Sequence, residues 1–332
     1  MTRGSCVVVA AVLLAVPACK GAGREVVVYT SVDQPFSEPI FREFEKRSGT
    51  KVLAVFDTEE TKSTGVLNRL IAEAQRPQAD VFWSGDPVRP FLLVKRGLVQ
   101  PYVSPAAATV PSQFKAPDGT WTGSAARARI LLVNKQKVPA AEMPRSIRDL
   151  AAPRWKRQTA IANPLFGTTT MHVAALFALW GDEKGRAFLD DLKKNETRIA
   201  SSNGEVKRLV VAGEVAFGLC DTDDAGEALH DGAPVEVVYP DQDGIGTLVM
   251  PTAVVLMKGP HPNEGRALVD WLVSAEVDKR MAEIASHMPL RGDVQVPGVR
   301  SASSFRSMQV DYGRVGEEME RVEPWLRRWV GL

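Results

Sequence analysis

Cysteine and histidine are scarce in this chain, which has three cysteines and four histidines among 332 residues. Three cysteines cannot build a disulfide framework or a four-cysteine zinc site. The HExxH, GxSxG, CxxC and P-loop patterns are also absent. An enzyme with Cys220 as its nucleophile stays open as an alternative, but no histidine has an evident place to serve it. We therefore expect no catalytic residues, no cofactor and no enzyme.

An excess of charge of either sign is missing as well. Lysine and arginine together number 41, aspartate and glutamate 40, and the formal net charge is +1. Nucleic-acid-binding proteins usually carry a basic excess, so we expect no nucleic acid as a partner. The 45 % of apolar residues is ordinary for a soluble globular protein, and the length suggests about two domains.

Long hydrophobic runs are lacking, because the apolar run at residues 7–16 is only ten residues long. A membrane-spanning helix needs about 20 apolar residues. The run follows Arg3 and precedes a small residue and a cysteine, which is the layout of a secretory signal peptide. We therefore expect an exported protein.

Residues 16–19 (VPAC) resemble a bacterial lipobox. The resemblance implies that residues 1–18 are a signal peptide, that Cys19 is lipidated, and that residues 19–24 are a tether. The protein would then be periplasmic or at the cell surface, attached to the membrane by its lipid alone. A plain signal peptide that is cut near Ala18 or Ala22 remains the alternative.

Strand-like and helix-like segments alternate through the rest of the chain. β-Branched and buried-type runs predict strands at residues 26–29, 51–56, 79–83, 159–162, 197–200, 215–220, 234–239 and 253–257. Helical apolar spacing predicts helices at residues 37–48, 67–74, 87–96, 168–180, 185–192, 205–211, 262–273 and 276–285. This alternation is typical of βαβ units and a parallel sheet, so the fold class is α/β.

Two such halves follow each other without a proline- or glycine-rich linker, so we expect strands to join them. The crossover candidates are residues 127–134 and 239–250. Residues 25–125 with 247–290 would form lobe 1, and residues 126–246 would form lobe 2. An amphipathic helix within residues 291–332 would pack on the body. Two crossings enclose a cleft that closes by hinging.

Ligands of open α/β sheets bind beyond the carboxyl ends of the strands. That rule selects polar residues in several loops of both predicted lobes. The candidate ligand-binding residues are Thr30, Ser31, Asp33, Glu59, Ser84, Asp86, Arg127, Asn163, Gly167, Thr168, Thr169, Ser202, Asp221, Thr222, Asp223, Tyr239 and Asp241.

Three groups of these residues have a definite chemistry. The helix start at residues 167–170 (GTTT) offers unpaired N–H groups and hydroxyls to an anion, although ordinary capping by Thr168 explains it equally well. Asp221 and Asp223, with Asp224, would suit a hard metal ion or an organic ammonium, or else only begin a helix. Arg127 and Arg129 share a strand face, where they would bind an anion or pair with the aspartates.

Several stretches together resemble bacterial extracellular solute-binding proteins of the ferric-iron-binding type. They are residues 28–31 (VYTS), 79–84 (ADVFWS), 239–246 (YPDQDGIG), 261–262 (HP), 268–274 (LVDWLVS) and 288–290 (MPL). The similarity runs from about residue 24 to residue 291. It implies a two-lobed periplasmic-binding-protein type II fold with two crossover strands and a ligand cleft between the lobes. It also implies a monomer that delivers its ligand to the permease and ATPase of an ABC importer.

The ligand is where the sequence departs from that family. Iron-binding members use adjacent tyrosines, whereas this chain reads Cys220-Asp221-Thr222-Asp223 at the corresponding place. If the ligand is ferric ion, Asp33, Asp221 and Asp223 are the expected metal ligands. An aminophosphonate, a phosphorylated solute or an iron chelate stays open. A ligand sensor for a membrane receptor is the alternative role.

Overall fold

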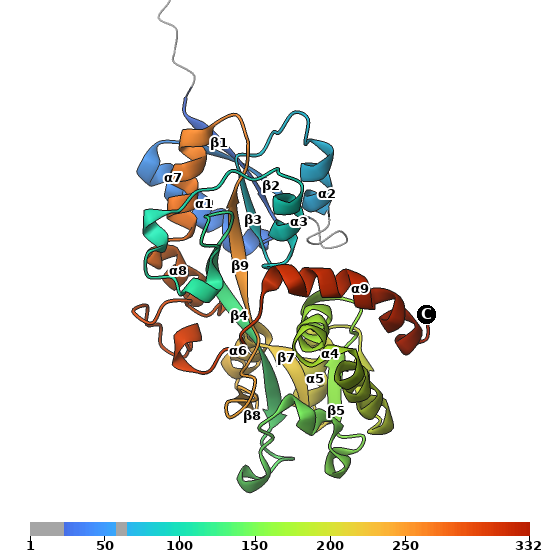
Figure 1. Ribbon diagram of the computed structural model, residues 1–332. Coiled ribbons are helices and arrows are strands. Elements are labelled where there is room, and N and C mark those ends of the chain that lie inside the picture. Colours follow the sequence, from blue (N-terminus) through green and yellow to red (C-terminus); the bar gives the residue numbers. More distant parts are fainter. Residues whose placement is uncertain (1–22, 58–64) are drawn as a thin grey trace, which may run out of the picture.

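The computed structural model describes residues 23–57 and 65–332 of the chain (Figure 1). The predictions for the signal peptide, for Cys19 and for Glu59 lie outside these residues. Within them, no helix combines the length and apolarity that a membrane crossing requires.

Lobe 1 is built on three parallel strands, β1 (Glu25–Thr30), β2 (Lys51–Phe56) and β3 (Val81–Ser84). β1 lies in the middle and pairs with both others, and its Val26 and Val28 are fully buried. The helices of this lobe are α1 (Gln34–Ser48), α2 (Gly65–Ala72), α3 (Arg89–Lys95), α7 (Pro262–Leu272) and α8 (Ala275–Ala285). The βαβ pattern predicted from the apolar runs is present here.

Lobe 2 repeats this arrangement with β5 (Thr159–Ala162), β6 (Arg198–Ala200) and β7 (Phe217–Asp221), all parallel and with β5 in the middle. Its helices are α4 (Gly167–Lys194), α5 (Asn203–Val211) and α6 (Thr222–His230). Gly181 leaves the helical conformation inside α4, at φ 77° and ψ 173°. This break separates the two helices that the sequence predicts over this segment.

Two long strands connect the lobes, β4 (Thr122–Asn134) and β9 (Val249–Leu256). The first half of β4 pairs with β9, and its second half pairs with β7 and with β8 (Val235–Val238). All of these pairings are antiparallel, so the whole sheet is mixed, in the order β2-β1-β3-β9-β4-β7-β5-β6, and is parallel only within each lobe. The expected second crossover is displaced, because residues 239–248 form a connection and the strand begins at Val249.

A bulge interrupts β4 shortly before the strand crosses between the lobes. The pairing register with β9 shifts between Ser124 and Ala126, and Ala125 has φ 45°. The Ala125 N–H donates to the Asp278 carboxylate at 2.8 Å, and Asp278 also pairs with Arg291 at 2.9 Å. Both charged groups are buried, so this ion pair holds the bulge in place.

The last helix, α9 (Tyr312–Val330), lies across both lobes (Figure 1). The apolar spacing predicts a stripe of Val315, Met319, Val322, Leu326 and Val330. Val315, Val322 and Leu326 are buried, and Met319 and Val330 are partly buried. Lys95 of α3 pairs with Glu317 at 2.5 Å, and Asp182 of α4 pairs with Arg321. Short 3-10 helices occupy connections at Pro105–Ala107, Ser112–Phe114, Ala140–Glu142, Ile147–Ala151, Pro153–Trp155 and Ala302–Ser304.

Candidate functional site

Three aspartates meet where β7 ends and α6 begins. Asp221 is the last residue of β7, and Asp223 and Asp224 stand in the first turn of α6. Carboxylates are favoured there because the N-terminal end of a helix carries a partial positive charge. One carboxylate oxygen from each residue lies within 4.8 Å of the others, so the three form a compact acidic group.

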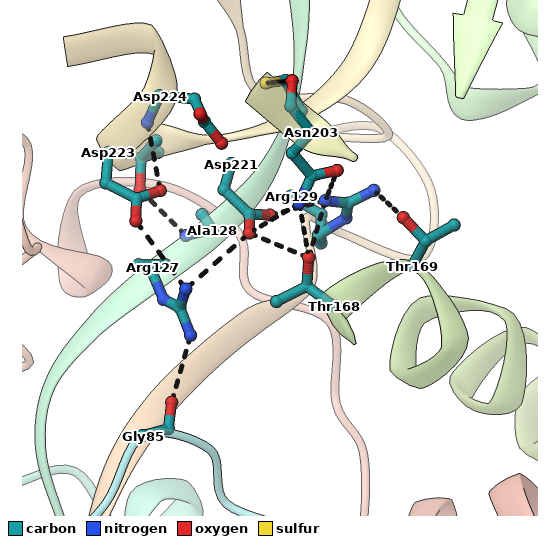
Figure 2. Close-up of polar contacts among 12 residues, drawn as sticks. Gly85, Arg127, Ala128, Arg129, Thr168, Thr169, Asn203, Asp221, Asp223 and Asp224 are labelled. Carbon is teal, nitrogen blue, oxygen red and sulfur yellow. Dashed lines mark hydrogen bonds and ion pairs between the residues drawn. The ribbon is translucent and has the colours of Figure 1, made fainter. Parts of the chain in front are cut away.

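Arg129 of β4 binds this group from the interior of lobe 2 (Figure 2). It faces Asp221 in the β4–β7 register and its side chain is fully buried. Its Nη1 atom donates to Asp221 Oδ1 at 2.6 Å and to Asn203 Oδ1 at 3.1 Å. The Arg129–Asp221 pair is therefore a buried ion pair with additional hydrogen bonds, the condition under which such pairs are retained.

The hydroxyls at the start of α4 complete the surroundings of Arg129. Thr168 Oγ1 accepts from Arg129 Nη1 at 3.0 Å, and Thr169 Oγ1 accepts from Nη2 at 3.1 Å. Thr168 also donates to Asp221 Oδ2 at 2.8 Å and accepts from Asn203 Nδ2 at 2.8 Å. The Thr168 hydroxyl, predicted to bind an anion, is thus already engaged by protein groups. Gly167 remains exposed beside it.

Arg127 lies two residues before Arg129 and is bonded far less completely. Its Nη2 atom donates to the Gly85 carbonyl of lobe 1 at 3.0 Å. Its Nη1 atom is 3.7 Å from Asp223 and 3.9 Å from Asp221, and its Nε atom has no hydrogen-bond partner. The side chain keeps 22 % of its surface exposed. Arg127 therefore presents unused donors at the junction of the two lobes (Figure 2).

The pKa values of two aspartates of the acidic group and of Arg127 are shifted. Burial raises the pKa of Asp224 to about 7, and repulsion from Asp223 and Asp221 adds to this shift. Burial also raises the pKa of Asp223, although Arg127 opposes the change. Burial lowers the pKa of Arg127, but the surrounding aspartates, which include Asp33 and Asp86 of lobe 1, raise it overall. Carboxylates of both lobes thus act on one guanidinium.

The predicted residues of lobe 1 shape its loops around this junction. Thr30 donates to the Trp83 carbonyl at 2.9 Å, and Ser31 Oγ accepts from the Gly85 N–H at 2.9 Å. Asp86 pairs with Arg89, and Ser84 accepts weakly from the Asp86 N–H at 3.4 Å. These bonds fix the Gly85 carbonyl that receives Arg127.

Other predicted residues of lobe 2 serve local structure. Asn163 Oδ1 accepts from the Leu165 N–H, Ser202 caps α5 through the Glu205 N–H, and Thr222 Oγ1 accepts from the Ala128 N–H at 3.1 Å. Tyr239 packs on Phe305 and Arg300. Asp241 binds Ser146 and the Ile147 N–H. The contacts of Tyr239 and Asp241 are therefore with the C-terminal segment and a 3-10 helix, away from Arg127.

Asn203 joins the site although the sequence pointed only to its neighbour Ser202. It donates to Asp221 Oδ2 at 3.1 Å and also bonds Arg129 and Thr168. The available signal was the polar run at residues 201–203 before the predicted helix at 205–211, and the structure begins α5 at Asn203.

All four tyrosines lie within the described part of the chain, and none contacts the acidic group. Tyr29 donates to Glu73, Tyr102 to Asp270 and Tyr312 to the Val249 carbonyl, while Tyr239 packs as stated. Burial raises the pKa of Tyr29 to about 12, and it raises the pKa of Tyr102 and Tyr312 too. The site therefore offers no phenolate to a ferric ion.

The histidines and the thiol near the site are buried. His172 is 2 % exposed and His287 is 7 % exposed, and burial lowers the pKa of each to about 3. Burial also raises the pKa of Cys220 well above its ordinary value. A neutral buried thiol is a poor nucleophile, so Cys220 lacks the setting that a catalytic cysteine needs.

Comparison with known proteins places this geometry in context. The family described as "Bacterial extracellular solute-binding protein" matches residues 77–314. Iron uptake protein A1 of Synechocystis is 28 % identical over 88 % of this chain and 82 % of its own length. A putative 2-aminoethylphosphonate-binding periplasmic protein of Salmonella paratyphi A is 25 % identical over 80 % of this chain and 74 % of its own.

Solved structures share the architecture. A Trichodesmium protein in complex with iron and citrate has a TM-score of 0.81 and 23 % identity, over 92 % of this chain and 99 % of its own. The expected two-lobed type II periplasmic-binding-protein fold is therefore confirmed.

Proposed function

The chain belongs to the bacterial extracellular solute-binding protein family, and from this premise we propose that it is the exported binding subunit of an ABC importer. It binds a small solute between its two lobes and delivers it to the permease and ATPase. The lobes close on the ligand by bending of β4 and β9, the two strands that join them. Hinged closure around a ligand is the usual motion of two lobes connected in this way.

The unused bonding capacity around Arg127 supports a ligand with both charges. Arg127 offers Nη1, and Asp223 and Asp224 have carboxylate oxygens whose nearest cations are 3.7 and 3.9 Å away. An acidic group of the solute accepts from the guanidinium, and an ammonium group donates to the carboxylates. Charge-assisted bonds of this kind are about twice as strong as neutral ones. A zwitterion of the aminophosphonate class fits both halves, and the Salmonella relative is named for such a solute.

A ferric chelate is the second candidate, favoured by the compact group of Asp221, Asp223 and Asp224. Carboxylate oxygens suit hard cations. Without a tyrosine, the iron would arrive with its own anionic ligands, and Arg127 would bind one of those anions. The Synechocystis relative is an iron uptake protein.

Calorimetric titration with 2-aminoethylphosphonate, ferric citrate and inorganic phosphate separates these candidates. We expect 2-aminoethylphosphonate to bind and, by mass action, to raise the free energy of unfolding by about 2.7 kcal/mol at a hundredfold excess over Kd, which also raises the melting temperature. Binding of ferric citrate alone would overturn the zwitterion and support the chelate. Binding of neither, with no other small anion active, would contradict an importer role for this site.

Asp223→Asn tests the cationic half of the recognition. We expect weaker binding of the amino compound with an unchanged fold. Asp231→Asn is the matched control, because Asp231 directly follows the same helix and its side chain is 69 % exposed. Equal affinity of the two variants would remove Asp223 from the site. Ligand-induced closure should also reduce the radius of gyration in X-ray solution scattering.

We also propose that the protein is a monomer anchored to the membrane by a lipid at Cys19. Cys19 carries the lipid, so Cys19→Ala should move the exported protein from the membrane fraction to the soluble fraction. The protein should elute as a monomer with and without ligand. Retention of Cys19→Ala in the membrane fraction would favour an anchor other than this lipid.

A further inference from the structure

One edge of lobe 1 collects the strand starts and helix ends. In consecutive βαβ units the parallel strands begin at the edge to which the connecting helices return. Here β1 begins at Glu25 and β2 at Lys51, while α1 ends at Ser48 and α3 at Lys95. Figure 1 shows β1 beginning at the end of lobe 1 that lies far from lobe 2. We call these residues, with the connections at 73–80 and 257–264, the basal edge.

Exposed basic side chains gather on the basal edge. Those that have no carboxylate partner among the described residues are Arg24, Lys46, Lys51, Arg76, Arg96 and Lys258. Arg24 donates to the Ser48 carbonyl at 2.5 Å, and Lys258 donates to the Gly97 carbonyl at 2.6 Å. These bonds join strand ends to the ends of α1 and α3, so the charges lie on one surface. Cations are favoured at helix C-termini, which explains part of the enrichment.

Acidic side chains balance the basal edge only in part. Glu276 and Glu317 are already paired with Arg47 and Lys95. Glu25, Glu45, Asp80 and Glu264 are the remaining carboxylates of the basal edge without an arginine or lysine partner among the described residues, and Asp80 is buried beside His261. Six basic groups without a carboxylate partner against these four leave an excess of two positive charges.

The opposite edge of lobe 1 carries Asp33, Asp57 and Asp86, and Asp86 pairs there with Arg89.

The basal edge is also where the chain continues toward Cys19. Three residues lie between Cys19 and Gly23, the first described residue, and the four Cα-to-Cα steps from one to the other span at most about 14 Å. The Debye length is about 8 Å at physiological ionic strength. An anchor at Cys19 would hold the basal edge within the range where a charged membrane surface acts on it.

We propose that the basal edge of lobe 1 docks on an anionic phospholipid bilayer. Docking there points lobe 2 and the junction of the two lobes away from the membrane, so the candidate site faces the solution that supplies the solute. This inference goes beyond ligand binding and uses the anchor only to explain the orientation. The surface itself should bind anionic lipid without the anchor.

Vesicle flotation tests the docking surface with the chain from residue 19 carrying Cys19→Ser. The vesicles are phosphatidylcholine alone or phosphatidylcholine mixed with phosphatidylglycerol. The basal variant combines Lys46→Glu, Lys51→Glu and Arg76→Glu. The control combines Lys135→Glu, Lys184→Glu and Arg208→Glu, which are exposed basic residues of lobe 2 without ion pairs among the described residues. Both variants change the net charge equally.

We expect the wild type and the control to float with phosphatidylglycerol vesicles at low salt and to be released by high salt. Each basic residue near an anionic surface contributes about fivefold in partitioning, so the basal variant should bind on the order of a hundredfold less. Equal binding of the basal variant and the control, or equal binding to phosphatidylcholine alone, would overturn the proposal. Ligand titration of each variant checks its fold, and the salt release of the wild type provides a readout that needs no substitution.

Discussion

Arg127 and Arg129 lie two residues apart on one face of β4, yet their surroundings differ sharply. Arg129 is fully buried and donates four hydrogen bonds to side chains of lobe 2. Arg127 donates one, to a carbonyl of lobe 1, and remains 22 % exposed. β4 pairs with β9 up to Ala128 and with β7 from Arg129 onward, so the strand changes lobes between the two arginines.

This difference separates positioning from recognition. Arg129 fixes the ends of β7, α4 and α5 against one another, and its side chain leaves no surface for a ligand. Arg127 stands where the lobes meet and retains unused donors. The same residue type on the same strand face thus acquires two roles, because neighbouring positions pair with different strands.

The largest effect should follow from Arg129→Met. Removing one partner of a buried ion pair costs about 3–5 kcal/mol, because it leaves Asp221 uncompensated in the interior. Urea denaturation should show this loss in the free energy of unfolding. The double variant Arg129→Met with Asp221→Asn should recover part of it, since the orphaned charge is gone. A loss below about 1 kcal/mol would refute the positioning role.

Arg127→Met should act on binding instead of stability. Its ion pairs are long and partly exposed, so unfolding should change by about 1 kcal/mol or less. Loss of the charged contact with the ligand should weaken affinity by about 2 kcal/mol or more, at least roughly thirtyfold. Calorimetry measures this, with the exposed Arg208→Met as control. Normal affinity of Arg127→Met would abolish the distinction between the two arginines.

Much of the fold was accessible from sequence because apolar periodicity reports burial directly. The run from Val26 to Tyr29 and the stripe of Val315, Val322 and Leu326 lie where they were expected. Pairing between distant strands leaves no such local pattern. The antiparallel crossovers and the start of β9 at Val249 therefore came only from the structure.

The sequence predicted the candidate site only as a set of loops. The strand-end rule selected Asp221 and Asp223, and a predicted crossing strand placed Arg127 near them; the structure joins the three by ion pairs. Period-2 spacing placed Arg127 and Arg129 on one face but gave no information about their partners. The contacts of Asn203 within the site, and those of Tyr239 and Asp241 away from it, depend on how lobe 2 packs. No short sequence motif predicts that packing.

A smaller effect should appear in the pH dependence of stability. Burial raises the pKa of Asp224 to about 7, whereas an unfolded aspartate titrates near 3.9. The folded state then binds more protons than the unfolded state between these values, so stability falls as pH rises from about 4 to 7. Asp224→Asn should remove a fall on the order of 1–3 kcal/mol. Asp231→Asn should retain the wild-type profile, and an identical profile for Asp224→Asn would contradict the shift.

Ser202→Ala should give the smallest effect, and it tests whether the Ser202 hydroxyl stabilises α5 or binds the ligand. Ser202 accepts the Glu205 N–H as the cap of α5, one residue before Asn203. Loss of an N-cap hydroxyl costs about 1 kcal/mol, whereas glycine at the same position costs only a few tenths. Thermal unfolding of Ser202→Ala and Ser202→Gly should follow this order, with ligand affinity unchanged in both. A drop in affinity without a drop in stability would instead place the Ser202 hydroxyl on the ligand and extend the recognition surface beyond Arg127 to the start of α5.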